Sequence, residues 1–234
     1  MLSHSDLSNG LAAVFQDNSY HGEDAYVSRE LSDHITFDAV FDGATGRGGA
    51  DASSYAAKAL AEATLETVEA LISFLDVTNT RLFQRGRGRF FLTTASVALK
   101  IGSTLHVVNV GDSPVFLIRG HDLMSLTGTA QGATFLGIAN ALGRHEKFAY
   151  KASSMSLKAD DRLILATDGL IENAAPSELA ALIDAAPSPE QAVTAMQQLL
   201  AEKKHANKGR VDDTSGFRRD DATAIIRYIG LASS

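Results

Sequence analysis

Acidic residues follow apolar runs at several places along the chain. The stretch "DAVFDGATG" (38–46) ends an apolar run with Asp42, and "LILATDGL" (163–170) does the same with Asp168. A glycine follows the aspartate in both stretches, and Asp-Gly is a strong turn signal, so each stretch taken alone is explained by a turn. The alternative is that each strand carries a carboxylate out of the core to a shared metal ion.

Carboxylates stand beside predicted strands in three further stretches. Taken singly, each is explained as a solvated strand-end charge or a turn residue. Taken together, they supply the oxygen donors that Mg²⁺ and Mn²⁺ prefer. Two such ions about 3.5–4 Å apart can activate a water and clamp the oxygens of a phosphoryl group. The further stretches contain Glu23 and Asp24 in "GEDAYV", Asp112 in "VGDS", and Asp220 with Asp221 in "RDDAT".

The composition limits the class of protein. The 234 residues include 45% hydrophobic and 21% charged residues, as in ordinary globular domains. The chain has no cysteine, which excludes disulfides, thiolate metal sites and cysteine catalysis. A formal net charge of -7 argues against a nucleic-acid partner. There is neither a signal peptide nor an apolar run of about 18 residues, so we expect no membrane partner and a cytoplasmic location.

Hydrophobic periodicity predicts the elements that must position these carboxylates. One long helix with an apolar side and a short second helix are expected between two groups of strands, and two amphipathic helices before the final strand. This order of elements favours an α+β domain with mostly antiparallel sheets, spanning 1–234. The predicted strands are 11–16, 24–31, 33–43, three or four strands within 93–127, 147–157, 160–169 and 221–229. The predicted helices are 50–75, a short helix at 77–86, 176–186 and 188–204.

Seven motifs occur in an order that resembles the metal-dependent protein phosphatases of type 2C, from about residue 10 to 229. The resemblance implies a β-sandwich of two packed sheets flanked by helices, with a centre for two Mn²⁺ or Mg²⁺ ions at one end. It also implies that a metal-activated water hydrolyses phosphoserine and phosphothreonine in proteins without a phosphoenzyme. The motifs are "GEDAYV", "FDAVFDGATG", "TTASVAL", "LHVVNVGDSPVFLIR", "NALG", "LKADDRLILATDGL" and "DDATAIIRYI".

The same resemblance assigns roles to individual residues. Asp42 would bridge the two ions and, with Asp168, form the catalytic pair. Asp221 stands where an Asn is common and is a poorer candidate ligand than Asp220. The implied metal-site residues are Asp24 as a ligand, Asp42 as the bridge, Gly43 through its backbone carbonyl, Asp168 and Asp220 at the first ion, Glu23 through a metal-bound water, and Asp112 at a third, weaker ion.

The chain departs from the family pattern at positions that affect substrate binding. Ser19 stands where an Arg commonly holds the substrate phosphate, and the residue after "DG" is Ala44, so the His that serves some members as a general acid is absent. The segment 128–139, where the family has a mobile flap, is short. Arg47 and His21 are the remaining candidates for the phosphate; each is also explained as a solvated loop charge or a turn histidine.

The leading hypothesis is a compact, bacterial-style serine/threonine phosphatase that acts in signal transduction as a monomer on a phosphoprotein made by a kinase. A second possibility is an enzyme dedicated to a single phosphoprotein partner, as in sporulation-type relatives. A third, from a different class, is a sensor or scaffold that keeps the fold without efficient turnover. The loss of the phosphate-binding Arg favours the third, whereas the retained carboxylates argue against it.

Overall fold

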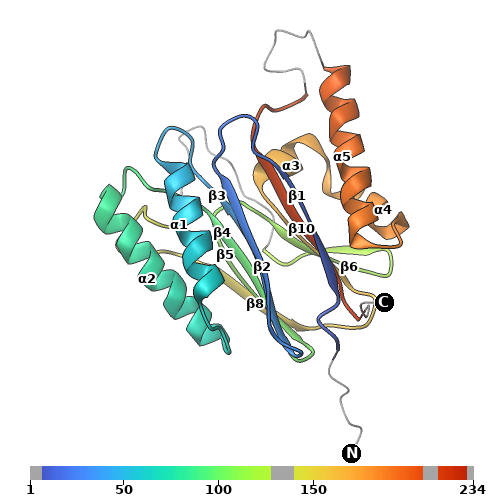
Figure 1. The fold of residues 1–234 in the computed structure, drawn as a ribbon, viewed down its shortest axis with the longest axis horizontal. Helices are drawn as coiled ribbons and strands as arrows, with labels where there is room; N and C mark the ends of the chain where they lie inside the picture. The colour runs from blue at the N-terminus through green and yellow to red at the C-terminus, as the bar shows by residue number, and fades with distance from the viewer. Residues whose placement is uncertain (1–6, 128–139, 208–215, 231–234) are drawn as a thin grey trace, which may run out of the picture.

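Two five-stranded sheets face each other at the centre of the fold (Figure 1). The computed structural model describes residues 7–127, 140–207 and 216–230. The strand orders are β1-β10-β9-β6-β7 and β2-β3-β4-β5-β8, with antiparallel pairing throughout. The strands are β1 (Leu11–Asp17), β2 (Asp24–Ser32), β3 (Ile35–Asp42), β4 (Ala95–Ile101), β5 (Thr104–Val110), β6 (Val115–Arg119), β7 (Asp122–Ser125), β8 (Lys151–Ser156), β9 (Arg162–Ala166) and β10 (Ala222–Tyr228).

Helices cover the outer face of each sheet, which confirms the predicted α+β class with two packed antiparallel sheets. Among the described residues, no helix is long and apolar enough to span a membrane. The helices are α1 (Gly49–Glu62) and α2 (Val68–Gly86) on one side, and α3 (Asp168–Asn173), α4 (Pro176–Ala185) and α5 (Pro189–Ala206) on the other.

The predicted division of the first helical region was wrong. A helix over 50–75 was expected, but α1 ends at Glu62 and α2 continues without a break through residues 75–77. The break falls where Thr67 begins α2 as its N-cap, its side chain accepting a hydrogen bond from the backbone N–H of Ala70. No glycine or proline marks this break, so residue type alone did not reveal it. A further helix, α3, was also missed, because it is short and directly follows a strand.

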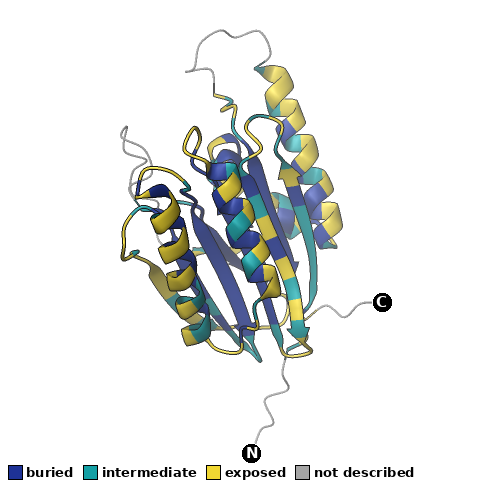
Figure 2. Cartoon of the chain, turned by 60° about the vertical axis from the view of Figure 1, so that its left-hand side comes forward, coloured by how far each residue is buried: buried dark blue, intermediate teal, exposed yellow. Residues whose placement is uncertain are grey.

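Alternating side chains of β3 serve two separate cores. Phe37, Ala39 and Phe41 pack toward α1 and α2, whereas Val40 lies in the core between the two sheets. Both faces of this strand are therefore buried, and Figure 2 shows the strands as largely buried beneath helices whose outer faces are exposed. A third core lies between the other sheet and the helices α4 and α5.

A buried ion pair joins the two sheets. The guanidinium of Arg227 on β10 donates through Nε to Asp38 Oδ2 at 2.6 Å and through Nη2 to Asp38 Oδ1 at 2.8 Å. Both side chains are only 2–3% exposed. Ser28 on β2 donates to the same carboxylate at 2.7 Å. This bidentate ion pair fixes the position of β3 in one sheet relative to β10 in the other. It therefore also fixes how the ends of the two sheets meet.

Candidate metal centre

Three aspartates from distant parts of the chain converge at one end of the sandwich. Asp42 is the last residue of β3, Asp112 lies in the turn between β5 and β6, and Asp168 is the first residue of α3. One carboxylate oxygen from each lies within 4.8 Å of the others, and all three side chains are partly buried. Turns that merely reverse the chain do not require such convergence, so the geometry favours the shared-metal alternative.

The glycine after Asp42 allows a close crossing of backbones. A Cβ atom on Gly43 would lie 2.4 Å from the carbonyl carbon of Gly49 and 2.6 Å from the backbone oxygen of Glu23. The N–H of Gly43 donates to that same oxygen of Glu23 at 3.1 Å. Gly43 is therefore needed for packing at the strand end, and it holds Glu23 beside Asp42.

The glycine after Asp168 has a similar role on the opposite sheet. A Cβ on Gly169 would lie 2.0 Å from the backbone oxygen of Asp221. Asn173, at the end of α3, donates to the backbone oxygens of Gly169 at 2.8 Å and Arg218 at 2.9 Å. It also accepts the N–H of Arg218 at 2.7 Å. These contacts hold the segment before β10 against α3, which brings Asp220 close to Asp168.

Asp24 lies deeper than the three converging aspartates. It stands directly opposite Asp42 in the β2–β3 register, and its Oδ2 accepts a hydrogen bond from the hydroxyl of Thr167 at 2.8 Å. Burial raises the pKa of Asp24 to about 7, and the charges of Asp221 and Asp168 add to this, although hydrogen bonds from Thr167 and Thr223 oppose it. Thr167 thus links the ends of the two sheets through this carboxylate.

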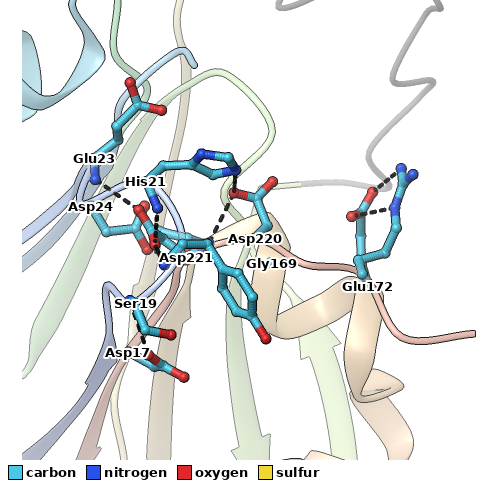
Figure 3. A network of polar contacts seen from close by, with 12 residues as sticks. Asp17, Ser19, His21, Glu23, Asp24, Gly169, Glu172, Asp220 and Asp221 are labelled. Atoms are coloured by element: carbon cyan, nitrogen blue, oxygen red, sulfur yellow. Dashed lines mark hydrogen bonds and ion pairs between the residues drawn. The ribbon is translucent and has the colours of Figure 1, made fainter. Parts of the chain in front are cut away.

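Asp221 shapes the loop that precedes β2. Its Oδ1 accepts the backbone N–H groups of Tyr20 at 3.1 Å and His21 at 3.0 Å, and its Oδ2 accepts that of Glu23 at 2.7 Å (Figure 3). The residue is only 3% exposed. Because its carboxylate is engaged by three backbone donors, Asp221 positions Glu23 and is less suited than Asp220 to ligate an ion. No local sequence pattern indicates this role, because the hydrogen-bond partners are about 200 residues away.

Asp220 lies at the more open side of the site. Its Oδ1 accepts the N–H of Asp221 at 2.9 Å and lies 3.9 Å from Nε2 of His21 (Figure 3). The side chain is 41% exposed. Burial nevertheless raises the pKa of Asp220. Asp220 is not part of the tight trio, but its charge helps to raise the pKa of Asp168.

Two buried carboxylate oxygens have no hydrogen-bond partner within residues 7–127, 140–207 and 216–230. They are Oε2 of Glu23 and Oδ1 of Asp112. An unpaired buried oxygen is costly unless an ion or an ordered water satisfies it. Both residues belong to the predicted metal site, and all the donors there are hard oxygen atoms. The chemistry of the donor set therefore fits Mg²⁺ or Mn²⁺.

The electrostatics of the cluster also fit cations. Burial raises the pKa of Asp42 well above its ordinary value, and the neighbouring charges of Asp168 and Asp24 raise it further. Burial raises the pKa of Asp168 to about 6, with added effects from Asp112 and Asp220. Like charges held together in a partly buried site favour protonation unless a cation is bound.

The residues considered for the substrate phosphate lie in different surroundings. Ser19 donates its backbone N–H to Asp17 Oδ1 at 3.1 Å and carries no charge. His21 lies beside Asp220, as described above, whereas the exposed Arg47 donates to the backbone oxygen of Arg89 at 3.3 Å. The segment 128–139, which includes the expected flap, lies outside the described residues.

Arg218 is a cation near the site that sequence reasoning missed. Its Nε and Nη2 donate to the two carboxylate oxygens of Glu172 at 2.8 and 2.9 Å, and its Nη1 contacts no hydrogen-bond acceptor among the described residues. The pKa of Arg218 is raised chiefly by the bond to Glu172, and the charges of Asp168 and Asp220 contribute. The motif "FRRDD" (217–221) places this arginine two residues before Asp220, which was the available signal.

The fold and site together define a phosphatase-like domain of type 2C, and the comparisons identify the family. The sequence model of stage II sporulation protein E (SpoIIE) matches residues 43–226, so the chain belongs to this family. A search of curated proteins returned no significant match.

Solved structures of bacterial serine/threonine phosphatases share the fold at low identity. PppA, described as a regulatory component of the type VI secretion system in Pseudomonas aeruginosa, is 20% identical with a TM-score of 0.78, covering 96% of this chain and 99% of that one. Stp1 from Staphylococcus aureus is 19% identical with a TM-score of 0.77 and 96% coverage of both chains. The PstP catalytic domain, solved with two manganese ions, is 19% identical with a TM-score of 0.71, covering 94% and 98%.

We expect Mn²⁺ to raise the melting temperature, and to raise it more at about pH 8 than at about pH 5.5. The raised pKa values of Asp24 (about 7) and Asp168 (about 6) mean that, without metal, these groups favour folding at low pH. That contribution is lost as the pH rises through those values, where the carboxylates ionise and repel each other. A divalent ion binds the ionised form, so its stabilising effect grows over the same range. Thermal unfolding with and without Mn²⁺ measures this difference.

Two variants control that measurement. Asp42→Asn removes the proposed bridging charge and should largely abolish the shift caused by Mn²⁺. Asp122→Asn removes an exposed charge from the start of β7, outside the acidic cluster, and should leave the shift unchanged. An Asp42→Asn protein that Mn²⁺ stabilises as strongly as the wild type would contradict the assignment.

Proposed function

We propose that the chain hydrolyses phosphoserine and phosphothreonine in proteins with the help of two Mn²⁺ or Mg²⁺ ions. The observation that carries this proposal is the convergence of Asp42, Asp112 and Asp168 within 4.8 Å. Buried oxygens of Glu23 and Asp112 that have no hydrogen-bond partner in the described part of the chain add to it. Membership of the SpoIIE family and the fold shared with serine/threonine phosphatases support the same reaction class. The manganese ions of PstP support the choice of metal.

Each carboxylate has a distinct place in the proposed site. Asp42 would bridge the ions, with Asp168 and Asp220 on one side and the backbone carbonyl of Gly43 on the other. Asp24 would contribute from the buried side, where Thr167 fixes its orientation. Two such ions, when bound, supply an activated water and neutralise the oxygens of the phosphoryl group. A third, weaker ion at Asp112 is part of the proposal.

Glu23 would act from outside the direct ligand set. Its backbone is fixed by Asp221 through one hydrogen bond and by Gly43 through another, and its buried Oε2 has no hydrogen-bond partner among the described residues. A carboxylate held in this way can accept a hydrogen bond from a water in the site and orient it. Its loss should therefore disturb the reaction less than the loss of a direct ligand.

The kinetics of carboxylate variants test this proposal. With saturating Mn²⁺ and p-nitrophenyl phosphate, Glu23→Gln should lower kcat by about 10- to 100-fold, the size typical of outer-shell partners. Asp168→Ala and Asp220→Ala should each lower it further, because direct ligands are lost, while the far-ultraviolet circular dichroism stays unchanged. Asp122→Asn serves as the control. A larger loss for Glu23→Gln than for Asp168→Ala would refute the ordering, and a wild type without Mn²⁺-dependent hydrolysis would refute the function.

Arg218 is the cation best placed to replace the phosphate-binding arginine that is absent at Ser19. Glu172 holds its guanidinium in a fixed orientation, and Nη1 has no acceptor among the described residues. Arg218 lies near the acidic centre, because Asn173 of α3, the helix that begins at Asp168, holds its backbone through two hydrogen bonds. A guanidinium there could pair with phosphate oxygens that point away from the ions.

We expect Arg218→Ala to raise KM while kcat changes little, because binding is lost from the substrate and the transition state alike. Arg219→Ala is the matched control, since it removes the neighbouring, exposed arginine. Steady-state kinetics on a phosphothreonine peptide at saturating Mn²⁺ measure both. His21→Ala in the same series tests the histidine beside Asp220. If Arg218→Ala has the same KM as the wild type and Arg219→Ala, the phosphate is held by another group.

A further inference from the structure

The loop "RGRGRFF" (85–91) alternates buried glycines with exposed arginines. Gly86 and Gly88 are buried, whereas Arg85, Arg87 and Arg89 are exposed. A Cβ on Gly88 would lie 2.5 Å from the backbone oxygen of Arg144, and φ at this residue is +70°. The backbone at Gly88 is thus packed tightly against Arg144, whereas the three arginine side chains are exposed.

Two further arginines contact this loop through side-chain hydrogen bonds to its backbone oxygens. Nη1 of Arg144 donates to the backbone oxygen of Gly88 at 2.9 Å, and Nη1 of Arg47 donates to that of Arg89 at 3.3 Å. The guanidinium of Arg85 lies 3.9 Å from the centre of the Phe91 ring. We call this set the arginine surface: Arg47, Arg85, Arg87, Arg89 and Arg144, together with Phe90, which is 53% exposed.

The arginine surface lies beside the acidic centre. Phe91 donates its N–H to the backbone oxygen of Arg47 at 2.6 Å, and Ala44 donates to that of Leu92 at 3.0 Å. The N–H of Thr94 donates to the backbone oxygen of Asp42 at 2.8 Å. The loop therefore packs on the strand end that carries Asp42. Figure 1 shows α2 ending and α1 beginning at the end of the sandwich where α3 also begins.

Little negative charge compensates these arginines. Of these five arginines, only Arg85 has an ion pair with a described residue, at 3.9 Å to Asp51, and both side chains are more than half exposed at 59% and 68%. No ion pair with a described residue is formed by Arg47, Arg87, Arg89 or Arg144. Such a concentration of positive charge is unusual in a chain with a formal net charge of -7.

We propose that the arginine surface binds an acidic segment of the phosphoprotein substrate, next to the phosphorylated residue; this inference rests on the proposed function. Guanidinium groups pair with carboxylates through two parallel hydrogen bonds, and the exposed Phe90 offers an apolar contact within the same surface. The overall negative charge and the adjacent carboxylates of the metal centre disfavour a nucleic acid or an anionic membrane as the partner. An acidic peptide of limited length fits a charged surface of this extent.

The test compares two phosphothreonine peptides of equal length, one flanked by glutamates and one by glutamines. The wild type should hydrolyse the acidic peptide with the higher kcat/KM, and added NaCl should reduce this preference. The double variant Arg87→Glu/Arg89→Glu should lower kcat/KM for the acidic peptide about tenfold and leave p-nitrophenyl phosphate hydrolysis unchanged. Arg87→Lys/Arg89→Lys should retain most of the preference.

A matched control separates a local effect from net charge. Lys58→Glu/Lys158→Glu makes the same change in charge at exposed positions outside the arginine surface, and should not alter the preference. The proposal is wrong if the wild type shows no preference for the acidic peptide. It is also wrong if Arg87→Glu/Arg89→Glu and Lys58→Glu/Lys158→Glu lose this preference equally. It is also wrong if Arg87→Glu/Arg89→Glu reduces binding to RNA or phosphatidylserine vesicles but not to the acidic peptide.

A binding measurement keeps this test independent of catalysis. Fluorescence anisotropy with the acidic, unphosphorylated peptide reports the arginine surface even if no hydrolysis occurs. Absence of Mn²⁺-dependent p-nitrophenyl phosphate hydrolysis would refute the proposed function alone. Peptide binding that is equal in the wild type and in Arg87→Glu/Arg89→Glu would refute the inference alone.

Discussion

Mutual repulsion among carboxylates is the constraint on which the rest of the site depends. Asp24, Asp42 and Asp168 are held where burial and neighbouring charges raise the pKa of each. In an isolated chain segment these carboxylates would move apart, so the folded structure must hold them together. The two sheets do so by joining their ends through Thr167, and the buried pair of Arg227 with Asp38 fixes one sheet against the other. Repulsion among carboxylates held in this way favours the binding of a divalent cation, which would neutralise their charge.

The acidic centre also affects how the proposed phosphoprotein substrate could bind. Ionised carboxylates repel a phosphate group unless cations neutralise their charge. Two groups of arginines lie near this centre: Arg218, paired with Glu172 of α3, and the arginine surface, whose loop packs on the end of β3. In the proposed function the carboxylates would hold metal ions and these guanidinium groups would contact the anionic substrate.

The sequence predicted the strands well, because they leave local signals, and three of the aspartates that it singled out, Asp42, Asp112 and Asp168, come together in the structure. Period-two alternation over 35–42 reflects a strand packed on two cores, and Asp42 stands out because it follows directly. The roles of residues whose contacts are distant in the sequence left no such local signal. Asp221 shapes the loop at 20–23 across a separation of about 200 residues, and Arg218 is oriented by Glu172, 46 residues away. The break before α2 was missed because it relies on the side chain of Thr67 rather than on a glycine or proline.

The most direct test of the central claim is the position of bound metal in crystals soaked with Mn²⁺, measured by anomalous diffraction. The convergence of Asp42, Asp112 and Asp168 predicts two strong peaks about 3.5–4 Å apart, with the carboxylate of Asp42 in contact with both. Asp168 and Asp220 should lie beside one of them. A single peak, or a pair of peaks that Asp42 does not bridge, would contradict the proposed metal centre.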